Sequence, residues 1–486
     1  MKYLLAVLAG GLLPLALAPF GWWPLGMVSV GLWFYLARQN PNVAARLGWL
    51  FGVGKFGVGI SWVYVSINIY GNAHPALAVA LVALFVGGLS VFCMVNAVIY
   101  ARLRNESVVF DGLLFACLFV AFEWLLTWAF TGFPWLFPAY GHLQTVLAGF
   151  APIGGVLLVS LALTSSSCFA VAGYLADRKV WPLLLALAPW LLGALLLPVA
   201  WVSPGETRTV ALVQGNIDQA EKWLPRSRGP IVDAYLTMSE PHWGVDALIW
   251  PEAAITLMAH EAAPVLQSLQ RRGADTGTTV VLGLPSVAWL PGRGAVFRNT
   301  AVAVGAGEGR YVKRRLVPFG EYVPYESWLR GLIDFFDLPM SHAEPGAWHQ
   351  PLLRLGSDYA AVAICYEIVY PELVRAQARN ADVLVTLSND SWFGASIGPL
   401  QHLQMAQMRA LENGRWLLRG TNNGVTAIVD HRGRVMSRLP QFEAGTLVGG
   451  YRVMQGLTPF GRIGNWPVLG LLSVVLVFGA WRRYMG

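Results

Sequence analysis

Long uninterrupted runs of apolar residues dominate the first two hundred positions of the chain, and one more run returns at its end. Each run is close to the ~20 residues that an α-helix needs to cross the hydrocarbon core of a bilayer. The pattern predicts a membrane domain of seven transmembrane helices in residues 1–202 and a C-terminal transmembrane helix in residues 461–486. The predicted spans are residues 3–19, 22–37, 45–66, 77–100, 109–130, 147–174, 181–201 and 465–481.

Residues 203–460 follow a different pattern, in which short β-rich runs alternate with polar segments of helical periodicity. This alternation predicts a separate α/β domain with a layered core. Helical periodicity is clearest over residues 262–272 and 399–413. The expected strands are residues 207–214, 247–250, 278–284, 300–304, 353–364, 383–387 and 426–429.

Charge indicates how the chain is oriented. Only 13% of its residues are charged, about half the share of an ordinary soluble protein. The net charge of +7 comes without a basic run or base-stacking motif, so membrane topology explains it better than nucleic-acid binding. The basic residues fall at alternate ends of the spans, which predicts a cytoplasmic N-terminus and places residues 203–460 on the outer side. They are Lys2, Arg38, Arg46, Arg102, Arg104, Arg178, Lys179, Arg482 and Arg483.

The first apolar run also resembles a cleavable signal peptide. Because Pro19 follows its small-residue ending and further spans come at once, we favour an uncleaved helix. Either interpretation leaves the orientation of the downstream chain unchanged.

Cys365 is the most informative residue of the outer domain. It follows a buried apolar run directly, so a strand end would hold its thiol rigidly at a sheet edge. The other cysteines, at positions 93, 117 and 168, fall in predicted spans, so Cys365 has no disulfide partner within its domain. Free cysteines often only pack in a core, yet an unpaired thiol on the outer side favours a nucleophile.

A thiol nucleophile needs a base and a group that stabilises an oxyanion. Glu252 ends one expected strand, and Lys313 precedes a turn that carries a second acid, Glu321. Taken singly, Glu252 could also be a helix N-terminal acid and Lys313 a solvated cation. The histidines of the domain lie outside any motif, and His402 remains an alternative base.

In this order, the strand-borne glutamate, the lysine and the Cys-Tyr-Glu stretch resemble the Glu-Lys-Cys triad of the nitrilase superfamily. With the apolar spans on both sides, the chain resembles the bacterial apolipoprotein N-acyltransferase family over nearly its whole length. The motifs that fit are Val213-Gln214-Gly215-Asn216, Trp250-Pro251-Glu252, Leu316-Val317-Pro318-Phe319-Gly320-Glu321, Cys365-Tyr366-Glu367 and Ser388-Asn389-Asp390-Ser391-Trp392-Phe393-Gly394.

The resemblance implies a nitrilase-like α-β-β-α sandwich in residues 203–460 and a catalytic triad of Glu252, Lys313 and Cys365. Glu252 would act as the base, Lys313 would stabilise the oxyanion, and Cys365 would carry the acyl group as a thioester. The resemblance also implies supporting or substrate-binding residues, namely Glu321 (to orient Lys313), Tyr366, Glu367, Trp223, Asn389 and Trp392. For Trp223 a simple core aromatic, and for Asn389 a turn-forming residue, explain the sequence equally well.

The family resemblance further implies the reaction and the partners. A phospholipid, which we expect to be phosphatidylethanolamine, would donate an acyl chain to the N-terminal diacylglyceryl-cysteine of an apolipoprotein. The enzyme would need no metal or cofactor and would lie in the bacterial inner membrane, with its catalytic domain facing the periplasm. The main alternative is a membrane-anchored amidase or nitrilase-type hydrolase, and a transporter or receptor would leave the triad unexplained.

Two further features of the sequence each allow two interpretations. Lys55 and Glu123 lie inside predicted spans, where ionisable residues are either functional or paired structurally. Residues 325–340 are rich in large apolar side chains and form either a lid that admits lipid or an amphipathic helix packed on the core. For the lid, we expect polar replacement of Phe335 and Phe336 to slow thioester formation without unfolding the domain.

Overall fold

The computed structural model describes residues 1–176, 180–290, 294–322 and 343–485. The chain forms two compact units. The helical unit comprises Met1–Tyr64, His74–Trp201 and Thr458–Gly486, and the sheet unit comprises Val65–Ala73 and Val202–Leu457. The predicted lid, residues 325–340, lies outside the described residues.

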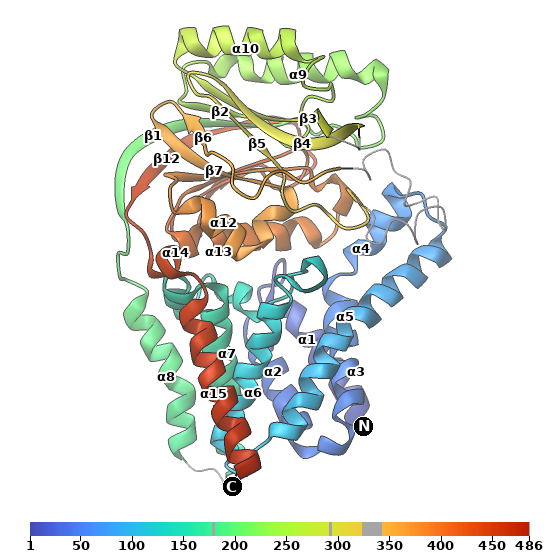
Figure 1. Cartoon of the computed structure of the whole chain (residues 1–486), viewed down its shortest axis with the longest axis vertical. Coiled ribbons are helices and arrows are strands. Elements are labelled where there is room, and N and C mark those ends of the chain that lie inside the picture. The colour runs from blue at the N-terminus through green and yellow to red at the C-terminus, as the bar shows by residue number, and fades with distance from the viewer. Residues whose placement is uncertain (177–179, 291–293, 323–342, 486) are drawn as a thin grey trace. The chain divides into compact units, whose positions relative to one another are not determined.

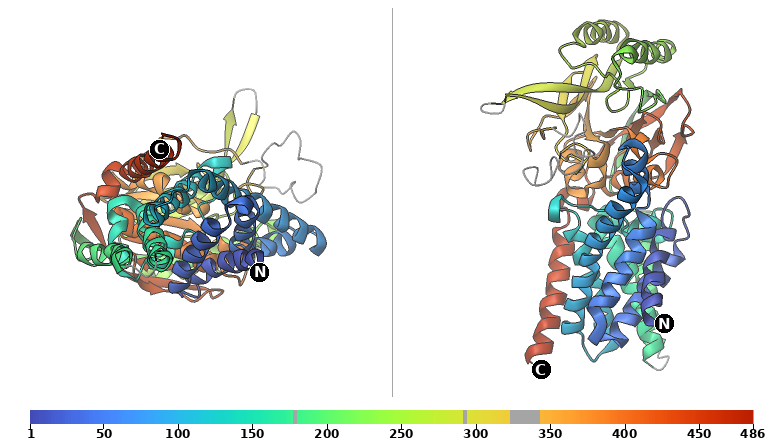
Figure 2. Two further views of the ribbon diagram at one scale, coloured as in Figure 1. Left: turned by 90° about the horizontal axis from the view of Figure 1, so that it is seen from below. Right: turned by 90° about the vertical axis from the view of Figure 1, so that its right-hand side faces the viewer.

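The helices of the helical unit follow the apolar runs of the sequence, with proline at several first turns, where the missing N–H costs no hydrogen bond. Figure 2 shows its long helices side by side. One contact within the unit joins α6 and α15, where Phe110 packs edge-on against Phe478. Its helices are α1 (Lys2–Leu12), α2 (Pro24–Gln39), α3 (Ala44–Gly59), α5 (Pro75–Leu103), α6 (Val108–Leu125), α7 (Ala151–Leu175), α8 (Val180–Leu196), α14 (Pro459–Ile463) and α15 (Trp466–Met485); α4 (Trp62–Val65) leads out of the unit.

Among the described residues, four helices are long and apolar enough to cross a membrane. They are Pro75–Leu103, Val108–Leu125, Val146–Leu175 and Trp466–Arg483. A fifth candidate is bent by 56° between Pro41–Gly59 and Trp62–Tyr70, within the run predicted as one span. Two shorter apolar helices, Lys2–Ala16 and Val180–Leu196, correspond to further predicted spans. The multi-span helical architecture expected from the hydrophobic pattern is thus present.

The described strands of the sheet unit form two six-stranded sheets, in the orders β12-β1-β2-β3-β4-β5 and β11-β10-β9-β8-β7-β6. Helices α9 (Arg228–Ser239) and α10 (Ala263–Thr276) lie on one outer face, and α12 (Pro371–Ala378) and α13 (Gly398–Asn413) lie on the other (Figure 1). This is the α-β-β-α order that the family resemblance implied. The strands are β1 (Ser203–Gln214), β2 (Ala247–Ile249), β3 (Thr279–Leu290), β4 (Gly294–Gly305), β5 (Gly309–Val312), β6 (Leu353–Leu355), β7 (Asp358–Ile364), β8 (Val383–Ser388), β9 (Leu417–Thr421), β10 (Ala427–Val429), β11 (Val435–Arg438) and β12 (Gly445–Gln455).

Successive side chains of the buried strands alternate between two separate apolar clusters. In β1, Val210 and Leu212 join the apolar cluster between the sheets, whereas Ala211 and Val213 join the cluster beneath α9 and α10. Successive side chains of a strand point to opposite faces, so a strand buried on both faces needs apolar residues throughout. The central strands β1, β2 and β3 pair in parallel, as do β7, β8 and β9. Glu252, Cys365 and Asn389 follow the carboxyl ends of β2, β7 and β8.

Antiparallel pairs extend the first sheet on both sides. β1 pairs with β12, and β3 forms a long hairpin with β4 that extends away from the other strands (Figure 2). The segment Val65–Ala73, which the hydrophobic pattern assigned to the end of a span and an outer loop, belongs to the sheet unit. The hydroxyl of Ser66 donates to the carbonyl of Trp392 at 2.7 Å, and Tyr70 packs edge-on against the Trp392 ring.

Candidate active site

Glu252 lies in the turn that follows β2, and the neighbouring strand β3 fixes this turn. The backbone N–H of Gly283 in β3 donates to the carbonyl of Pro251 at 3.2 Å. A Cβ on Gly283 would lie 2.8 Å from the Glu252 Cα and 2.6 Å from the Ala253 nitrogen, so only glycine allows this approach. Ala253 itself has a positive φ of 47°, a conformation typical of constrained functional turns. Glu252 is only 7% exposed.

Three donors bind the Glu252 carboxylate. Its Oε1 accepts hydrogen bonds from Asn299 Nδ2 at 2.7 Å and from Lys313 Nζ at 3.2 Å. Its Oε2 accepts from the backbone N–H of Asn389 at 2.9 Å. The carboxylate is therefore fixed by groups from β4, from the end of β5 and from the end of β8.

Lys313 directly follows β5 and is almost fully buried. Its Nζ lies 2.8 Å from Oε1 of Glu321, in addition to its contact with Glu252. Burial alone would lower the pKa of this ammonium, but the charges of Glu252 and Glu321 outweigh burial and hold the pKa well above its usual value. Lys313 thus remains a cation through the physiological range of pH.

Cys365 ends β7 and begins a short 3-10 turn, Cys365–Val369. Its φ of 51° is in the left-handed region, which costs a residue with a side chain about 1–2 kcal/mol. Burial raises the pKa of the thiol, and the Glu252 carboxylate raises it further, while Lys313 and a hydrogen bond with Ser388 lower it. The net pKa lies above the usual value, so the resting thiol is protonated and needs a base to become a nucleophile.

Glu367 joins the lysine turn to the cysteine turn. One carboxylate oxygen accepts from the Tyr311 hydroxyl at 2.9 Å and from the backbone N–H groups of Arg314 and Arg315 at 2.8 and 3.1 Å. The other accepts from the backbone N–H of Ile364 at 2.8 Å. The side chain is fully buried. Glu367 therefore fixes the backbone beside both Lys313 and Cys365.

The remaining predicted site residues differ in how directly they contact Glu252, Lys313 and Cys365. Asn389 reaches Glu252 through its backbone, while its side chain donates to Gln219 Oε1 at 2.8 Å. Tyr366 follows the cysteine and packs edge-on against Tyr370, with ring centroids 5.2 Å apart. Trp392 and Trp223 are half-buried, and Trp392 contacts the segment Val65–Ala73.

Two contributors were not predicted from the sequence. Asn299 bridges the carboxylates of Glu252 and Glu321, donating to the latter at 3.2 Å. The buried Lys222 donates to the carbonyl of Glu252 at 3.2 Å, and burial lowers the pKa of its ammonium to about 8. Asn299 lies one residue before an expected strand, and Lys222 precedes the family-matched Trp223, so a signal was present but not specific.

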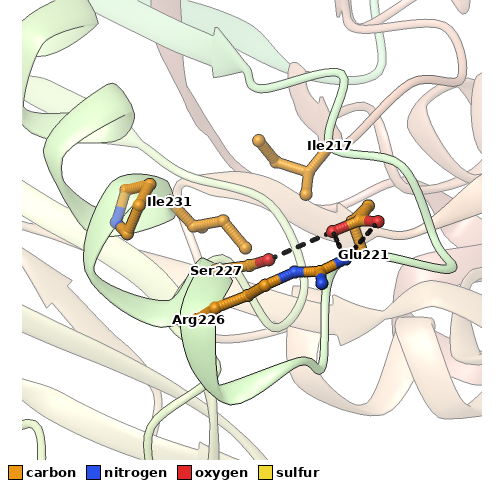
Figure 3. A pocket seen from close by; sticks show the side chains of 6 residues that line it. Ile217, Glu221, Arg226, Ser227 and Ile231 are labelled. Carbon is orange, nitrogen blue, oxygen red and sulfur yellow. Dashed lines mark hydrogen bonds and ion pairs between the residues drawn. The ribbon is translucent and has the colours of Figure 1, made fainter.

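An open groove lies beside the loop that carries Lys222 (Figure 3). None of the predicted site residues lines it, and its Arg226–Glu221 pair is too exposed to contribute much to stability. Among the described residues, no three His, Cys, Asp or Glu side chains are grouped so that they could hold a metal ion. The groove is lined by Ile217, Glu221, Arg226, Ser227, Pro230 and Ile231.

Comparison with known proteins places the chain in a family. Residues 9–169 match the family model described as apolipoprotein N-acyltransferase N-terminal domain, and residues 209–452 match carbon-nitrogen hydrolase. The apolipoprotein N-acyltransferase of Pseudomonas syringae pv. tomato is 44% identical, over 98% of this chain and 95% of its own length. That of Vibrio cholerae is 39% identical, over 99% of this chain and 97% of its own.

Among solved structures, Saccharomyces cerevisiae Nit3, a member of branch 10 of the nitrilase superfamily, aligns with a TM-score of 0.39 and 16% identity. The alignment covers 52% of this chain and 92% of that one. The sequence matches confirm the family resemblance that the motifs indicated. With relatives this similar along almost its entire length, the chain belongs to the apolipoprotein N-acyltransferase family, and its sheet unit has the nitrilase-like fold of the carbon-nitrogen hydrolases.

Proposed function

We propose that this protein transfers an acyl chain from a membrane phospholipid to the α-amino group of the N-terminal diacylglyceryl-cysteine of apolipoproteins. Family membership supports the overall reaction. The single observation that carries the chemistry is the position of the Lys313 ammonium, within hydrogen-bonding distance of both Glu252 and Glu321. Its charge also lowers the pKa of the Cys365 thiol.

In the first half-reaction, Glu252 takes the proton of the Cys365 thiol, and the thiolate attacks the ester carbonyl of the phospholipid. Lys313 keeps its proton and stabilises the tetrahedral oxyanion. Collapse breaks the C–O bond of the ester, and Glu252 returns its proton to the leaving alkoxide. The products are a thioester on Cys365 and a lysophospholipid. We propose phosphatidylethanolamine as the donor.

In the second half-reaction, the α-amine of the apolipoprotein attacks the thioester carbonyl, and Glu252 takes the proton that the nitrogen loses. Collapse of the second tetrahedral intermediate breaks the C–S bond and forms an amide. The Cys365 sulfur leaves as a thiolate and recovers the proton from Glu252. An amide is more stable than the ester that was consumed, so the sequence runs toward the acylated lipoprotein.

The proposal extends to domain organisation and location. Residues 1–202 would form a membrane domain of seven transmembrane helices, residues 203–460 the catalytic domain, and residues 461–486 the last transmembrane helix. The alternating basic residues support a catalytic domain on the periplasmic side of the bacterial inner membrane. Labelling of single cysteines placed in the loops with a membrane-impermeant reagent tests this orientation.

Intact-protein mass spectrometry tests the first half-reaction. The full chain, in detergent micelles with phosphatidylethanolamine, should gain the mass of one acyl chain, and hydroxylamine should remove it. Cys365→Ala should gain nothing. Addition of a peptide with an N-terminal diacylglyceryl-cysteine should then move the acyl chain to the peptide as a hydroxylamine-resistant amide. Release of free fatty acid without peptide acylation would instead support a hydrolase.

A further inference from the structure

His402 lies on α13 and is almost fully buried directly behind the cysteine turn. Its Nε2 lies 3.1 Å from the backbone carbonyl oxygen of Cys365. Its ring packs perpendicular to the ring of Phe393, with centroids 6.2 Å apart. The imidazole therefore contacts the backbone of the cysteine that the proposed function makes the nucleophile.

The opposite edge of the His402 ring contacts a buried ion pair. Nδ1 lies 3.1 Å from Arg419 Nη2 and 3.0 Å from Asp390 Oδ1. Asp390 also accepts from Arg419 Nη2 at 2.7 Å and from the Ser388 hydroxyl at 2.6 Å. All four side chains are buried, and they come from α13, β9, the end of β8 and the residues that follow it. We call Ser388, Asp390, His402 and Arg419 the histidine cluster.

The donors and acceptors of this cluster fix the proton on His402. Burial, and then the charge of Arg419, lower the pKa of the imidazole, so the ring is neutral and carries one proton. A carbonyl oxygen can only accept and a guanidinium can only donate. Nε2 faces the carbonyl oxygen of Cys365, so it carries a proton and donates, whereas Nδ1 lies against both Arg419 Nη2 and Asp390 Oδ1 and faces away from Cys365. Neither ring nitrogen is free to take a proton from the thiol.

The histidine cluster contacts Cys365 at a second point. Ser388 lowers the pKa of the Cys365 thiol, which places its side chain beside the sulfur, and the Ser388 hydroxyl donates to Asp390 at 2.6 Å. The carbonyl and the sulfur of one residue are thus connected through Ser388, Asp390 and His402. Cys365 has a positive φ, so its backbone would relax away from this conformation unless neighbouring groups held it.

We infer that His402, oriented by Asp390 and Arg419, is a positioning residue that holds the backbone of Cys365 in its left-handed conformation and so aims the sulfur at the substrate carbonyl. The inference rests on the proposed role of Cys365 as the nucleophile. It excludes His402 as the general base, which the sequence alone left open. Glu252, whose charge acts on the Cys365 thiol, then remains the proposed base.

Two substitutions separate positioning from other roles. The side-chain amide of His402→Gln ends where Nε2 lies and can still donate to the Cys365 carbonyl, whereas that of His402→Asn ends near Nδ1 and cannot. The readout is the rate at which iodoacetamide alkylates Cys365 in the full-length protein, because alkylation needs no lipid. Cys365→Ala provides the background from the other three cysteines, and His349→Asn, at an exposed histidine, is the matched control.

We expect His402→Gln to alkylate within about threefold of the wild type, and His402→Asn to lose about tenfold or more, the effect of one lost hydrogen bond. The pH profile of alkylation should keep its shape in His402→Gln. Wild-type rates in both variants would overturn the inference. An equal loss of alkylation rate in both variants, together with loss of the pH-dependent part of the profile, would identify His402 as a base.

A third variant covers the case in which His402→Asn does not fold. Asp390→Asn keeps the size of the side chain but removes the charge that orients His402 and Ser388. Because that charge also raises the pKa of the Cys365 thiol, the comparison uses the alkylation rate of the thiolate, taken from the pH profile, which should fall between the two histidine variants. An unchanged rate in folded Asp390→Asn would also overturn the inference. If alkylation follows this pattern but no phospholipid acylates any variant, the proposed function fails while the positioning role stands.

Discussion

The ammonium of Lys313 lies closer to Glu321, at 2.8 Å, than to the carboxylate that we propose as the base, at 3.2 Å. Glu321 accepts a further hydrogen bond from the backbone N–H of Val317 at 2.8 Å, so it is itself fixed by the turn that carries it. This arrangement leaves Lys313 as a permanent cation between two carboxylates. It stabilises negative charge and does not transfer a proton.

Glu321→Gln tests this division of labour. The substitution keeps the shape of the side chain but removes one of the two charges that hold Lys313, so the ammonium should lose its fixed position. A hydrogen bond to a charged group contributes about 1.5–3 kcal/mol, so thioester formation should slow by roughly tenfold to a hundredfold. The rate is measured by mass spectrometry of the acyl-enzyme. Glu308→Gln removes a carboxylate of an exposed ion pair and is the control, which should leave the rate unchanged.

Glu252→Gln should affect two reactions of Cys365 in opposite directions. The Glu252 charge raises the pKa of the thiol, so its removal should move the alkylation midpoint to lower pH, and more thiolate should be present at a given pH. Acylation by phospholipid should nevertheless fall by about 10²-fold or more, because the base is lost. Iodoacetamide rates between about pH 7 and 10 give the first quantity, and acyl-enzyme formation gives the second. A fall in acylation together with a midpoint moved to higher pH would contradict the proposed role.

Much of the fold could be predicted because its signals are local. Residues 262–272 and 399–413 show helical periodicity and form the bulk of α10 and α13. The run 353–364 was expected as one strand, but Gly356, with a φ of 59°, turns it into the hairpin of β6 and β7. Strand β12 was missed because most of its first half is exposed or half-buried, and its pairing with β1 depends on residues about 240 positions away.

The candidate active site, like the fold, could be predicted only where its signals are local in the sequence. A glutamate or a cysteine directly after a buried strand can be identified from the sequence, and the family motifs add Lys313 and Glu321. The position of Asn299 beside an expected strand was not specific, because its contact with Glu252 depends on how β4 pairs with β3. The contact of His402 with the Cys365 carbonyl likewise requires α13 to pack behind the cysteine turn. Sequence patterns locate residues along elements, and tertiary packing decides which of these residues meet.

Lys222 gives a prediction about pH and stability. Its pKa is about 8 in the folded chain and about 10.5 when exposed, so between these values the unfolded chain binds the extra proton. Stability therefore rises with pH across this interval, by on the order of 3 kcal/mol from this group. Lys222→Met should lack this gain. Melting temperatures at about pH 7.5 and 10 should rise less, or fall more, in the variant than in the wild type, by several degrees.

The exposed Arg271 on α10 supplies a control for Lys222→Met. Arg271→Met also removes a cation but alters no buried group, so its pH dependence should follow that of the wild type. Equal pH dependence in wild type and Lys222→Met would show that the lysine is not held in a state that disfavours its charge.

Gly394→Ala tests the contact between the loop after β8 and the segment Val65–Ala73. Gly394 has φ 54° and ψ −156°, a conformation that is nearly confined to glycine. An added Cβ would also lie 3.0 Å from Cγ1 of Val65, in a region where Ser66 and Tyr70 contact Trp392. We expect the substitution to destabilise the sheet unit by about 1–3 kcal/mol and to displace Trp392. The quantities to measure are the melting temperature and the rate of thioester formation.

Gly277→Ala separates backbone strain from displacement of Trp392. Gly277 also has a positive φ, 74°, but an added Cβ there would meet no atom within 4 Å. This variant should lose about 1 kcal/mol of stability through strain alone and acylate at the wild-type rate. If Gly394→Ala loses activity well beyond its loss of stability while Gly277→Ala does not, the segment Val65–Ala73 contributes to the site through Trp392. Equal activity in the two variants would limit that segment to a structural role.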